Sequence, residues 1–438
     1  MVRRKLTATA VGRHSQTDPA ARSRQTALLR KRRCLRSLSH RSSLPIHVAE
    51  VIMKSFLFLA VVVIAGCAGP PAQRAYIERL GDDTTAIEVF TRTDDGFEGD
   101  LLVRLPVTRV AHYVGTLSDD GTISRLEVEW RTPAENPDGP DPERFVVTMD
   151  GDSATVVREA GGEAITERVA VPAGAIPQVG KSPWSYAVFE QAARQAVASG
   201  SDSFPVTFLS VGGRGARATS NAVTRHGRDS ISLNYFGSPM LVNIDSDGRI
   251  LGLNGEETTN KLAGEFVLDV DLASLAADFA ARDARGEGIG QPSPRGRAQF
   301  VAGGATIELD YGRPSKRGRD IFGGLVPFDE VWRTGANTAT HFTTDRDLMV
   351  GGAAVPAGVY TLWTTFTATS AHLIINKQTR QWGTDYDETQ DLARIEMTRE
   401  SLDETVEQFT MLVEPGSGGG TLQLRWDRTQ FSVPIRVR

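Results

Sequence analysis

Cysteine is nearly absent from this sequence of 438 residues, which contains only Cys34 and Cys67. The long remainder after residue 67 can therefore form no internal disulfide, no thiolate metal site and no cysteine nucleophile. Histidine is scarce too, and the four histidines after residue 67 do not have the spacing of a zinc site. The sequence also lacks a nucleophile elbow and a phosphate loop. We therefore expect no metal, no cofactor and no recognisable catalytic motif.

A long hydrophobic run is also lacking. The most apolar stretch, Phe56–Gly66, supplies about half of the ~20 residues that a transmembrane helix needs. It follows a lysine and ends in Ile64-Ala65-Gly66-Cys67, which is the layout of a secretory signal peptide. These four residues resemble a lipobox. The resemblance implies that residues 53–66 are a lipoprotein signal peptide, that Cys67 is lipidated and that residues 67–80 form a tether.

The first 52 residues are rich in basic side chains and poor in acidic ones, with 12 Lys or Arg against Asp18 and Glu50. The favoured interpretation is a non-native or disordered extension, with Met53 as the true first residue. A basic arm that binds nucleic acid is the alternative. Without this extension 37 basic and 52 acidic side chains remain. Such an acidic chain is not expected to bind nucleic acid.

The residue after the predicted lipidated cysteine indicates which membrane the protein is anchored to. This residue is Ala68 and not an aspartate, and by resemblance to lipoprotein sorting rules this implies the outer membrane. We therefore expect an exported protein that is anchored to the bacterial envelope through Cys67 and faces the periplasm. Its expected partners are the membrane and an unknown small ligand or envelope protein.

Short segments of alternating apolar and polar residues dominate the rest of the chain, with Asp-Gly and Gly-Gly dipeptides between them. The Gly- and Pro-rich segment 285–296 is the predicted linker between two parts. We expect a mainly β fold with two antiparallel β-rich domains. The first covers residues 81–284 and contains one packed helix, and the second covers residues 297–438 and resembles a β-sandwich.

Helices are expected at two places in the first domain. Ser182 fits an N-cap and Pro183 fits the first helical position, which predicts a helix over residues 183–199 that packs across the sheet. A second helix is expected from Leu272 to Arg285, directly after Asp271.

Several motifs near the C-terminus occur together and in a fixed order. They are Tyr311-Gly-Arg-Pro-Ser-Lys-Arg-Gly-Arg-Asp-Ile-Phe-Gly, Val326-Pro-Phe, Val331-Trp-Arg-Thr-Gly-Ala-Asn-Thr-Ala-Thr, Pro356-Ala-Gly-Val-Tyr-Thr-Leu, Asn376-Lys377, Trp382-Gly383 and Tyr386-Asp387. With these motifs, residues 297–438 resemble the bacterial domain of unknown function 2911. The resemblance implies a β-rich domain of exported bacterial proteins, without an assigned activity.

The same motifs contain the best candidates for a ligand site, because polar residues on glycine-rich loops over a rigid sheet are where sites tend to lie. A cluster of arginines and lysines could hold an anionic group by bidentate hydrogen bonds. The candidate ligand-binding residues are Arg313, Lys316, Arg319, Trp332, Arg333, Asn337, Asn376, Lys377, Trp382, Asp385 and Asp387. The alternative is structural, with Arg319 and Arg333 bracing loops against Asp329, Asp385 or Asp387.

Three functions compete at this point. The leading hypothesis is a non-enzymatic envelope lipoprotein that binds a ligand or a protein partner. The second is a hydrolase acting on an envelope glycan or an anionic ester, with Arg333 and Lys377 orienting the substrate and Asp385 or Asp387 as acid and base. The third makes both domains structural spacers.

Overall fold

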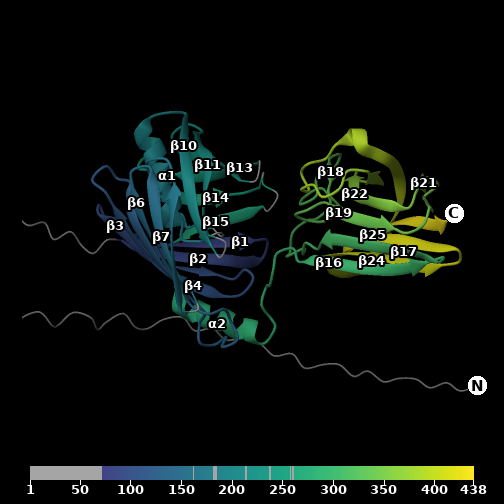
Figure 1. Cartoon of the computed structure of the whole chain (residues 1–438), viewed down its shortest axis with the longest axis horizontal. Helices are drawn as coiled ribbons and strands as arrows, with labels where there is room; N and C mark the ends of the chain where they lie inside the picture. Colours follow the sequence, from purple (N-terminus) through teal and green to yellow (C-terminus); the bar gives the residue numbers. More distant parts are fainter. Residues whose placement is uncertain are drawn as a thin grey trace, which may run out of the picture. The chain divides into compact units, whose positions relative to one another are not determined.

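A computed structural model of the chain describes residues 72–160, 162–180, 185–212, 215–235, 238–256, 258 and 261–438 (Figure 1). The predicted signal peptide, Cys67 and the predicted N-cap Ser182 lie outside these residues. The described chain is mainly β and forms two sheets whose strand pairs are antiparallel except for one, which confirms the predicted fold class. Neither helix among these residues is long and apolar enough to cross a bilayer.

The first sheet has fifteen strands in the order β8-β7-β6-β5-β4-β3-β2-β1-β15-β14-β13-β12-β11-β10-β9. Their bounds are β1 Arg74–Leu80, β2 Asp83–Arg92, β3 Gly96–Val103, β4 Arg109–Leu117, β5 Ile123–Arg131, β6 Glu143–Asp150, β7 Ser153–Ala160, β8 Glu163–Ala170, β9 Ile176–Pro177, β10 Ser203–Gly212, β11 Gly215–Arg225, β12 Ser230–Tyr235, β13 Ser238–Ile244, β14 Ile250–Asn254 and β15 Leu262–Val267. Sequential hairpins build this order, as the alternation and the Asp-Gly dipeptides predict.

Two helices pack on opposite faces of the first sheet. Helix α1 (Tyr186–Ser199) lies on the face that carries Tyr76 and Glu88, and the Tyr76 and Tyr186 rings stack with centroids 4.3 Å apart. Helix α2 (Leu272–Ala284) places Phe279 in a small cluster with Ile87 and other residues of the opposite face. Neighbouring residues of a strand point to opposite faces of the sheet, so β2 packs against α1 on one face and against α2 on the other.

The start of α1 differs from the prediction. Ser185 is the N-cap, with its side chain accepting from the Val188 amide at 3.4 Å, so the helix begins at Tyr186 and Ser182 was the wrong cap. The carboxylate of Glu88, far earlier in the chain, accepts from the amides of Tyr186 and Ala187. A negative charge at this end is favoured by the helix dipole. The end of α1 at Ser199 and the start of α2 after its N-cap Asp271 were predicted correctly.

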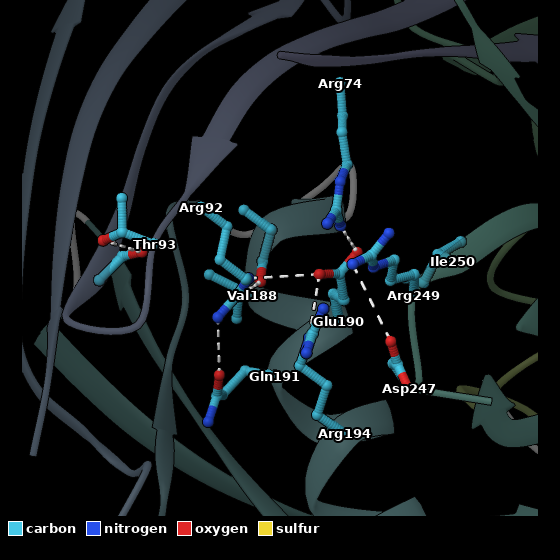
Figure 2. Close-up of polar contacts among 12 residues, drawn as sticks. Arg74, Arg92, Thr93, Val188, Glu190, Gln191, Arg194, Asp247, Arg249 and Ile250 are labelled. Carbon is cyan, nitrogen blue, oxygen red and sulfur yellow. Dashed lines mark hydrogen bonds and ion pairs between the residues drawn. The ribbon is translucent and has the colours of Figure 1, made fainter. Parts of the chain in front are cut away.

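A buried cluster of charges joins α1 to the sheet. Glu190 of α1 is fully buried, and three guanidinium groups point at its carboxylate: Arg74 of β1, Arg92 of β2 and Arg194 of α1 (Figure 2). The Nε atoms of Arg92 and Arg194 lie 3.2 and 3.1 Å from Glu190 Oε1. Arg92 also donates to the Gln191 side chain at 2.9 Å. One buried carboxylate therefore pairs with three guanidinium groups, which are themselves buried or half-buried.

The second sheet follows the order β16-β17-β19-β22-β23-β24-β25-β20-β21, with β18 paired to β22. Its elements are β16 Arg295–Ala302, β17 Ala305–Gly312, β18 Val331–Trp332, β19 Thr340–Thr344, β20 Leu348–Val350, β21 Ala353–Val355, β22 Gly358–Phe366, β23 Ala371–Asn376, the short 3-10 helix η1 Glu388–Gln390, β24 Asp391–Gly416 and β25 Gly419–Val437. The irregular pairing of β24 with β25 over residues 401–410 lets the long hairpin bend. Residues from both halves, such as Phe342 and Leu424, share one core, so the domain is sandwich-like.

We expect Glu190→Gln to lower the free energy of unfolding by about 3–5 kcal/mol, because it leaves three buried or half-buried arginines without their carboxylate. Thermal unfolding followed by circular dichroism measures the change. Glu265→Gln is the matched control: its carboxylate is exposed and makes one surface pair with Arg79 at 3.4 Å, which contributes less than about 1 kcal/mol. Equal stability of the two variants would contradict the structural role of Glu190.

Stability should also depend on pH through Glu78. Burial raises the pKa of this carboxyl from 4.5 to about 7, and one of its oxygens has no hydrogen-bond partner. The folded state therefore holds a proton that the unfolded state releases, so stability falls as the pH rises from about 4.5 to 7. The contribution of Glu78 over that range is about 3 kcal/mol. Burial raises the pKa of Glu88 to about 7 as well, so Glu88 contributes in the same direction.

Glu78→Gln should flatten this pH dependence without abolishing it, since Glu88 remains. The measurement is the melting temperature at several pH values between 5 and 8, compared with Glu129→Gln, which changes an exposed glutamate of β5. If Glu78→Gln and the wild type show the same slope, then Glu78 is not the titrating group.

Candidate functional site

The loop from Arg333 to Asn337 connects β18 to β19 and is held in an unusual backbone conformation. Thr334 and Asn337 have positive φ angles of 49° and 64°. The Thr340 hydroxyl donates to the Thr334 carbonyl at 2.7 Å, and the Thr334 hydroxyl bonds to Thr364 Oγ1 at 3.2 Å. The loop is therefore pinned to β19 and β22, and it presents Arg333 from a fixed position.

A second segment, around Gly383, lies beside this loop. The Gly383 amide donates to the Asn337 carbonyl at 2.9 Å, and Thr338 forms an isolated bridge with Trp382. A Cβ atom on Gly383 would stand 2.1 Å from Arg333 Cδ and 2.4 Å from the Asn337 carbonyl oxygen. Only a glycine leaves room here for the stem of the arginine.

Arg333 is a cation without a counter-ion. Its side chain is half-buried, and desolvation lowers the pKa of its guanidinium. Among the described residues no carboxylate lies within 4.0 Å of it, and its buried Nε has no hydrogen-bond partner. The expected bracing pairs with Asp329, Asp385 or Asp387 are not formed. Burying a charge in this way costs free energy unless a partner arrives.

Arg333 lines a pocket that we call the Arg333 pocket. Its lining consists of Leu80, Thr258, Lys261, Pro292, Ser293, Pro314, Arg319, Leu325, Pro327, Glu330, Val331, Trp332, Arg333, Gly335, Ala336, Asn337, Trp363, Gly383, Thr384, Tyr386 and Trp426. Aromatic rings supply much of the wall, because Trp332 stacks on Trp426 with centroids 5.9 Å apart and Trp363 contacts Tyr386 at 4.9 Å. Trp332 and Tyr386 keep part of their surface exposed. The pocket thus combines Arg333, which has no carboxylate within 4.0 Å, with apolar ring surface and three further charged side chains, Lys261, Arg319 and Glu330.

Four of the candidate residues meet in this pocket: Arg319, Trp332, Arg333 and Asn337. Arg319 differs from Arg333 because its guanidinium donates to the carbonyls of Ser315 and Lys316, at 2.6 and 3.0 Å. Its charge is therefore tied to the backbone of its own loop.

Two other basic candidates are used in packing. Arg313 donates to Thr410 Oγ1 at 3.4 Å, and the Lys316 ammonium lies 3.4 Å from a carboxylate oxygen of Asp427. Neither is part of the pocket lining. Their proximity to Arg333 in the sequence does not bring them to the same site.

The remaining candidates also lie outside the pocket lining. Asn376 is fully buried and donates to the Asp387 carbonyl at 2.8 Å, while the Asp387 carboxylate accepts from the Thr389 amide at 2.9 Å and caps η1. Lys377 and Asp385 are exposed. Trp382 is 46% exposed on the surface beside the pocket.

The prediction missed three pocket aromatics, Trp363, Tyr386 and Trp426. Tyr386 was within reach, since it belongs to a family motif together with Asp387. Trp363 and Trp426 lie in ordinary strands, where alternation marks them as core residues.

A second hollow, on β16, β17 and β19, shows why the Arg333 pocket is the better candidate. It is lined by residues that include Arg295, Arg297 and Asp310. The Nε atoms of the two arginines lie 2.5 and 3.5 Å from Asp310 carboxylate oxygens. These two arginines are therefore already paired with a carboxylate, while the third arginine of the lining, Arg380, is exposed. No group of three metal-binding side chains occurs among the described residues.

The second sheet is thus an antiparallel β-rich domain whose loops form most of the lining of a ligand-sized hollow, to which Leu80, Thr258 and Lys261 also contribute. Residues 293–435 match the model of a family described as protein of unknown function (DUF2911), which confirms the resemblance predicted for this part of the chain. A crystal structure of a DUF1089 family protein from Pseudomonas aeruginosa is similar at 15% identity, over 39% of this chain and 89% of that one, with a TM-score of 0.28. No curated protein matches the chain.

Gly383→Ala should disrupt the pocket, because the added methyl group overlaps Arg333 Cδ and the Asn337 carbonyl. We expect a loss of stability of about 1–3 kcal/mol, as for other overpacked sites. The measurement is the thermal unfolding midpoint. Gly416→Ala is the matched control, since the nearest atom to its new Cβ is 3.9 Å away. If the two variants melt alike, the close approach at Gly383 is not a constraint.

Proposed function

We propose that this protein is a membrane-anchored lipoprotein of the bacterial envelope that binds a small ligand with an anionic group in the Arg333 pocket. The observation that carries the proposal is the half-buried guanidinium of Arg333, whose buried Nε has no hydrogen-bond partner and which has no carboxylate of the described residues within 4.0 Å. A carboxylate or phosphate group would supply the missing charge and could accept two parallel hydrogen bonds from it.

The walls of the pocket indicate what the rest of the ligand is like. The faces of Trp332 and Tyr386 offer apolar, planar surface next to the cation. Pockets for small molecules combine such surface with a few polar groups that fix orientation. Asn337 is exposed at the same loop and can add a neutral hydrogen-bonding group. We therefore propose a ligand that joins an anionic group to a ring or another apolar part.

The anchor and the location are proposed from the sequence. The lipobox-like residues that end at Cys67 support lipidation of that thiol, and Ala68 supports the outer membrane, with the protein facing the periplasm. The partners are then the membrane and the ligand, and the acidic balance of the chain gives nucleic acid no support.

The competing hydrolase that uses Asp385 or Asp387 is not supported by the geometry. It needs Asp385 or Asp387 as acid and base next to Arg333. Both carboxylates lie outside the pocket lining, and that of Asp387 caps η1. A structural spacer function does not explain why Arg333 is half-buried without a carboxylate partner next to the exposed faces of Trp332 and Tyr386. Ligand binding is therefore the function we propose.

Native mass spectrometry of the full chain purified from its host membrane tests the binding site. We expect the wild type to carry an anionic small molecule and Arg333→Gln to lose it. Removing a charged hydrogen bond to a ligand typically weakens binding by about 2–5 kcal/mol, which is at least about 30-fold. Arg436→Gln, at an exposed arginine of β25, should retain the ligand. Retention by Arg333→Gln would refute the proposed site.

The anchor has a separate test. Cys67→Ser should move the protein from the membrane fraction to a soluble one, and the wild-type peptide that begins at residue 67 should carry the mass of a diacylglycerol. Cys34→Ser is the matched control, because it lies in the segment that is expected to be absent from the mature protein. An unmodified Cys67 peptide would contradict the anchor and would leave the pocket proposal intact.

A further inference from the structure

Three large apolar side chains are exposed near one another on the first sheet. Leu268, directly after β15, is 90% exposed, Leu251 of β14 is 52% exposed and Phe266 of β15 is 40% exposed. We call these three the β14–β15 patch. Single exposed apolar residues are common, but neighbouring ones mark surfaces that meet something apolar.

The strand register places the three together. Gly252 pairs with Glu265, so Leu251 and Phe266 are one step further along the same antiparallel pair and lie side by side. Leu268 follows the last residue of β15, two residues after Phe266, so it stays close to this pair in the chain. Phe266 also contacts Tyr76 edge-on, with ring centroids 5.6 Å apart, which continues the patch into the aromatic core.

The patch lies beside the start of β1. Tyr76 pairs with Phe266 and Ala75 pairs with Val267, so Leu268 is next to the first residue of β1, Arg74. The Tyr76 hydroxyl donates to the Ile250 carbonyl at 2.6 Å, which brings β14 to the same place. Figure 1 shows β1, β15 and β14 as neighbours in this order.

Arg74 is seven residues after Cys67, and seven residues of chain span at most about 25 Å. If Cys67 carries lipid, the start of β1 cannot be further than this from the membrane surface. The end of the first sheet that carries the β14–β15 patch is therefore the part of this sheet that the covalent chain holds closest to the bilayer. A short tether also gives the patch a high effective concentration at that surface.

We propose that the β14–β15 patch inserts at the boundary between the headgroup and acyl regions of the membrane to which Cys67 is anchored. This inference rests on the proposed lipid anchor. The partner is the lipid surface, which buries Leu251, Phe266 and Leu268 and provides a second attachment beside the acyl chains. A diacylglycerol on Cys67 already brings two acyl chains, so the patch would contribute mainly to the orientation of the domain at the surface and less to its retention there. The anchor and the patch would then fix the orientation of the first sheet on the membrane.

A fluorophore placed in the patch tests this directly. Leu268→Cys introduces the one free thiol of the lipidated, processed chain, because Cys67 is blocked and Cys34 is removed. The full-length protein is labelled with an environment-sensitive dye and reconstituted into phosphatidylethanolamine and phosphatidylglycerol vesicles with and without nitroxide-labelled lipid. We expect the label at position 268 to lose most of its fluorescence to the nitroxide lipid. Ile165→Cys, at a half-exposed residue of the edge strand β8, is the matched control and should not be quenched.

The outcomes separate the patch from the anchor. No quenching at position 268, in protein that sediments with the vesicles and has a lipidated Cys67 peptide, overturns the patch and leaves the anchor standing. A blue-shifted but unquenched label indicates burial against a second copy of the chain and also overturns the patch. An unmodified Cys67 in protein that stays in solution overturns the anchor, and the patch proposal falls with it.

Discussion

A guanidinium group that leaves water needs a counter-charge or another polar or aromatic partner, and the described arginines meet this need in different ways. Buried Arg104, for example, has no carboxylate within 4.0 Å, but it lies over the Phe279 ring and donates to the Thr84 carbonyl at 3.0 Å. In the first sheet, the Glu190 carboxylate forms ion pairs with three arginines, one each from β1, β2 and α1. The Glu190 carboxylate therefore holds α1 against the sheet. Without it, those guanidinium groups would have no counter-charge in a largely apolar interior. In the second sheet, Arg333 has no such partner. The contrast identifies the three arginines around Glu190 as part of the scaffold and Arg333 as available to a ligand.

The position of Arg333 depends on backbone features that have little to do with its charge. Gly383 provides space for the arginine stem, and hydrogen bonds from Thr334 and Thr340 hold the loop on β22 and β19. The half-buried guanidinium of Arg333 would turn further toward water if its loop could move. The hydrogen bonds of the loop prevent this movement, so the ligand-free protein keeps the free-energy cost of the partial burial. Binding of an anion would then recover part of that cost, which is a form of preorganisation.

Much of the fold was predictable from the sequence, since local rules determine it. Alternating segments separated by Asp-Gly and Gly-Gly predicted hairpins, and Asp271 marked the start of α2 because its capping bond is local. The start of α1 was predicted wrongly at Ser182. A tertiary contact contributes there, since Glu88 caps the helix from a strand about a hundred residues earlier and no local pattern contains that contact.

The site was predictable in part for the same reason. Arg333 and Asn337 lie on one loop, directly after Trp332 of β18, and the family motif pointed to all three. Arg313 and Lys316 looked equivalent in the sequence, but nearby side chains satisfy them in the fold. Trp363 and Trp426 come from strands whose registers bring them to the pocket, and register over long separations cannot be read from alternation alone. The sequence showed the cations, and the fold shows which of them lacks a partner.

The central claim is that Arg333 is kept at a cost to stability. Its most direct test is the unfolding free energy of ligand-free Arg333→Met, measured by chemical denaturation and compared with the wild type. Methionine keeps most of the side-chain volume and removes the charge, so we predict a gain of about 1 kcal/mol or more. A loss of about 3 kcal/mol or more, as expected when a paired buried charge is broken, would contradict the account.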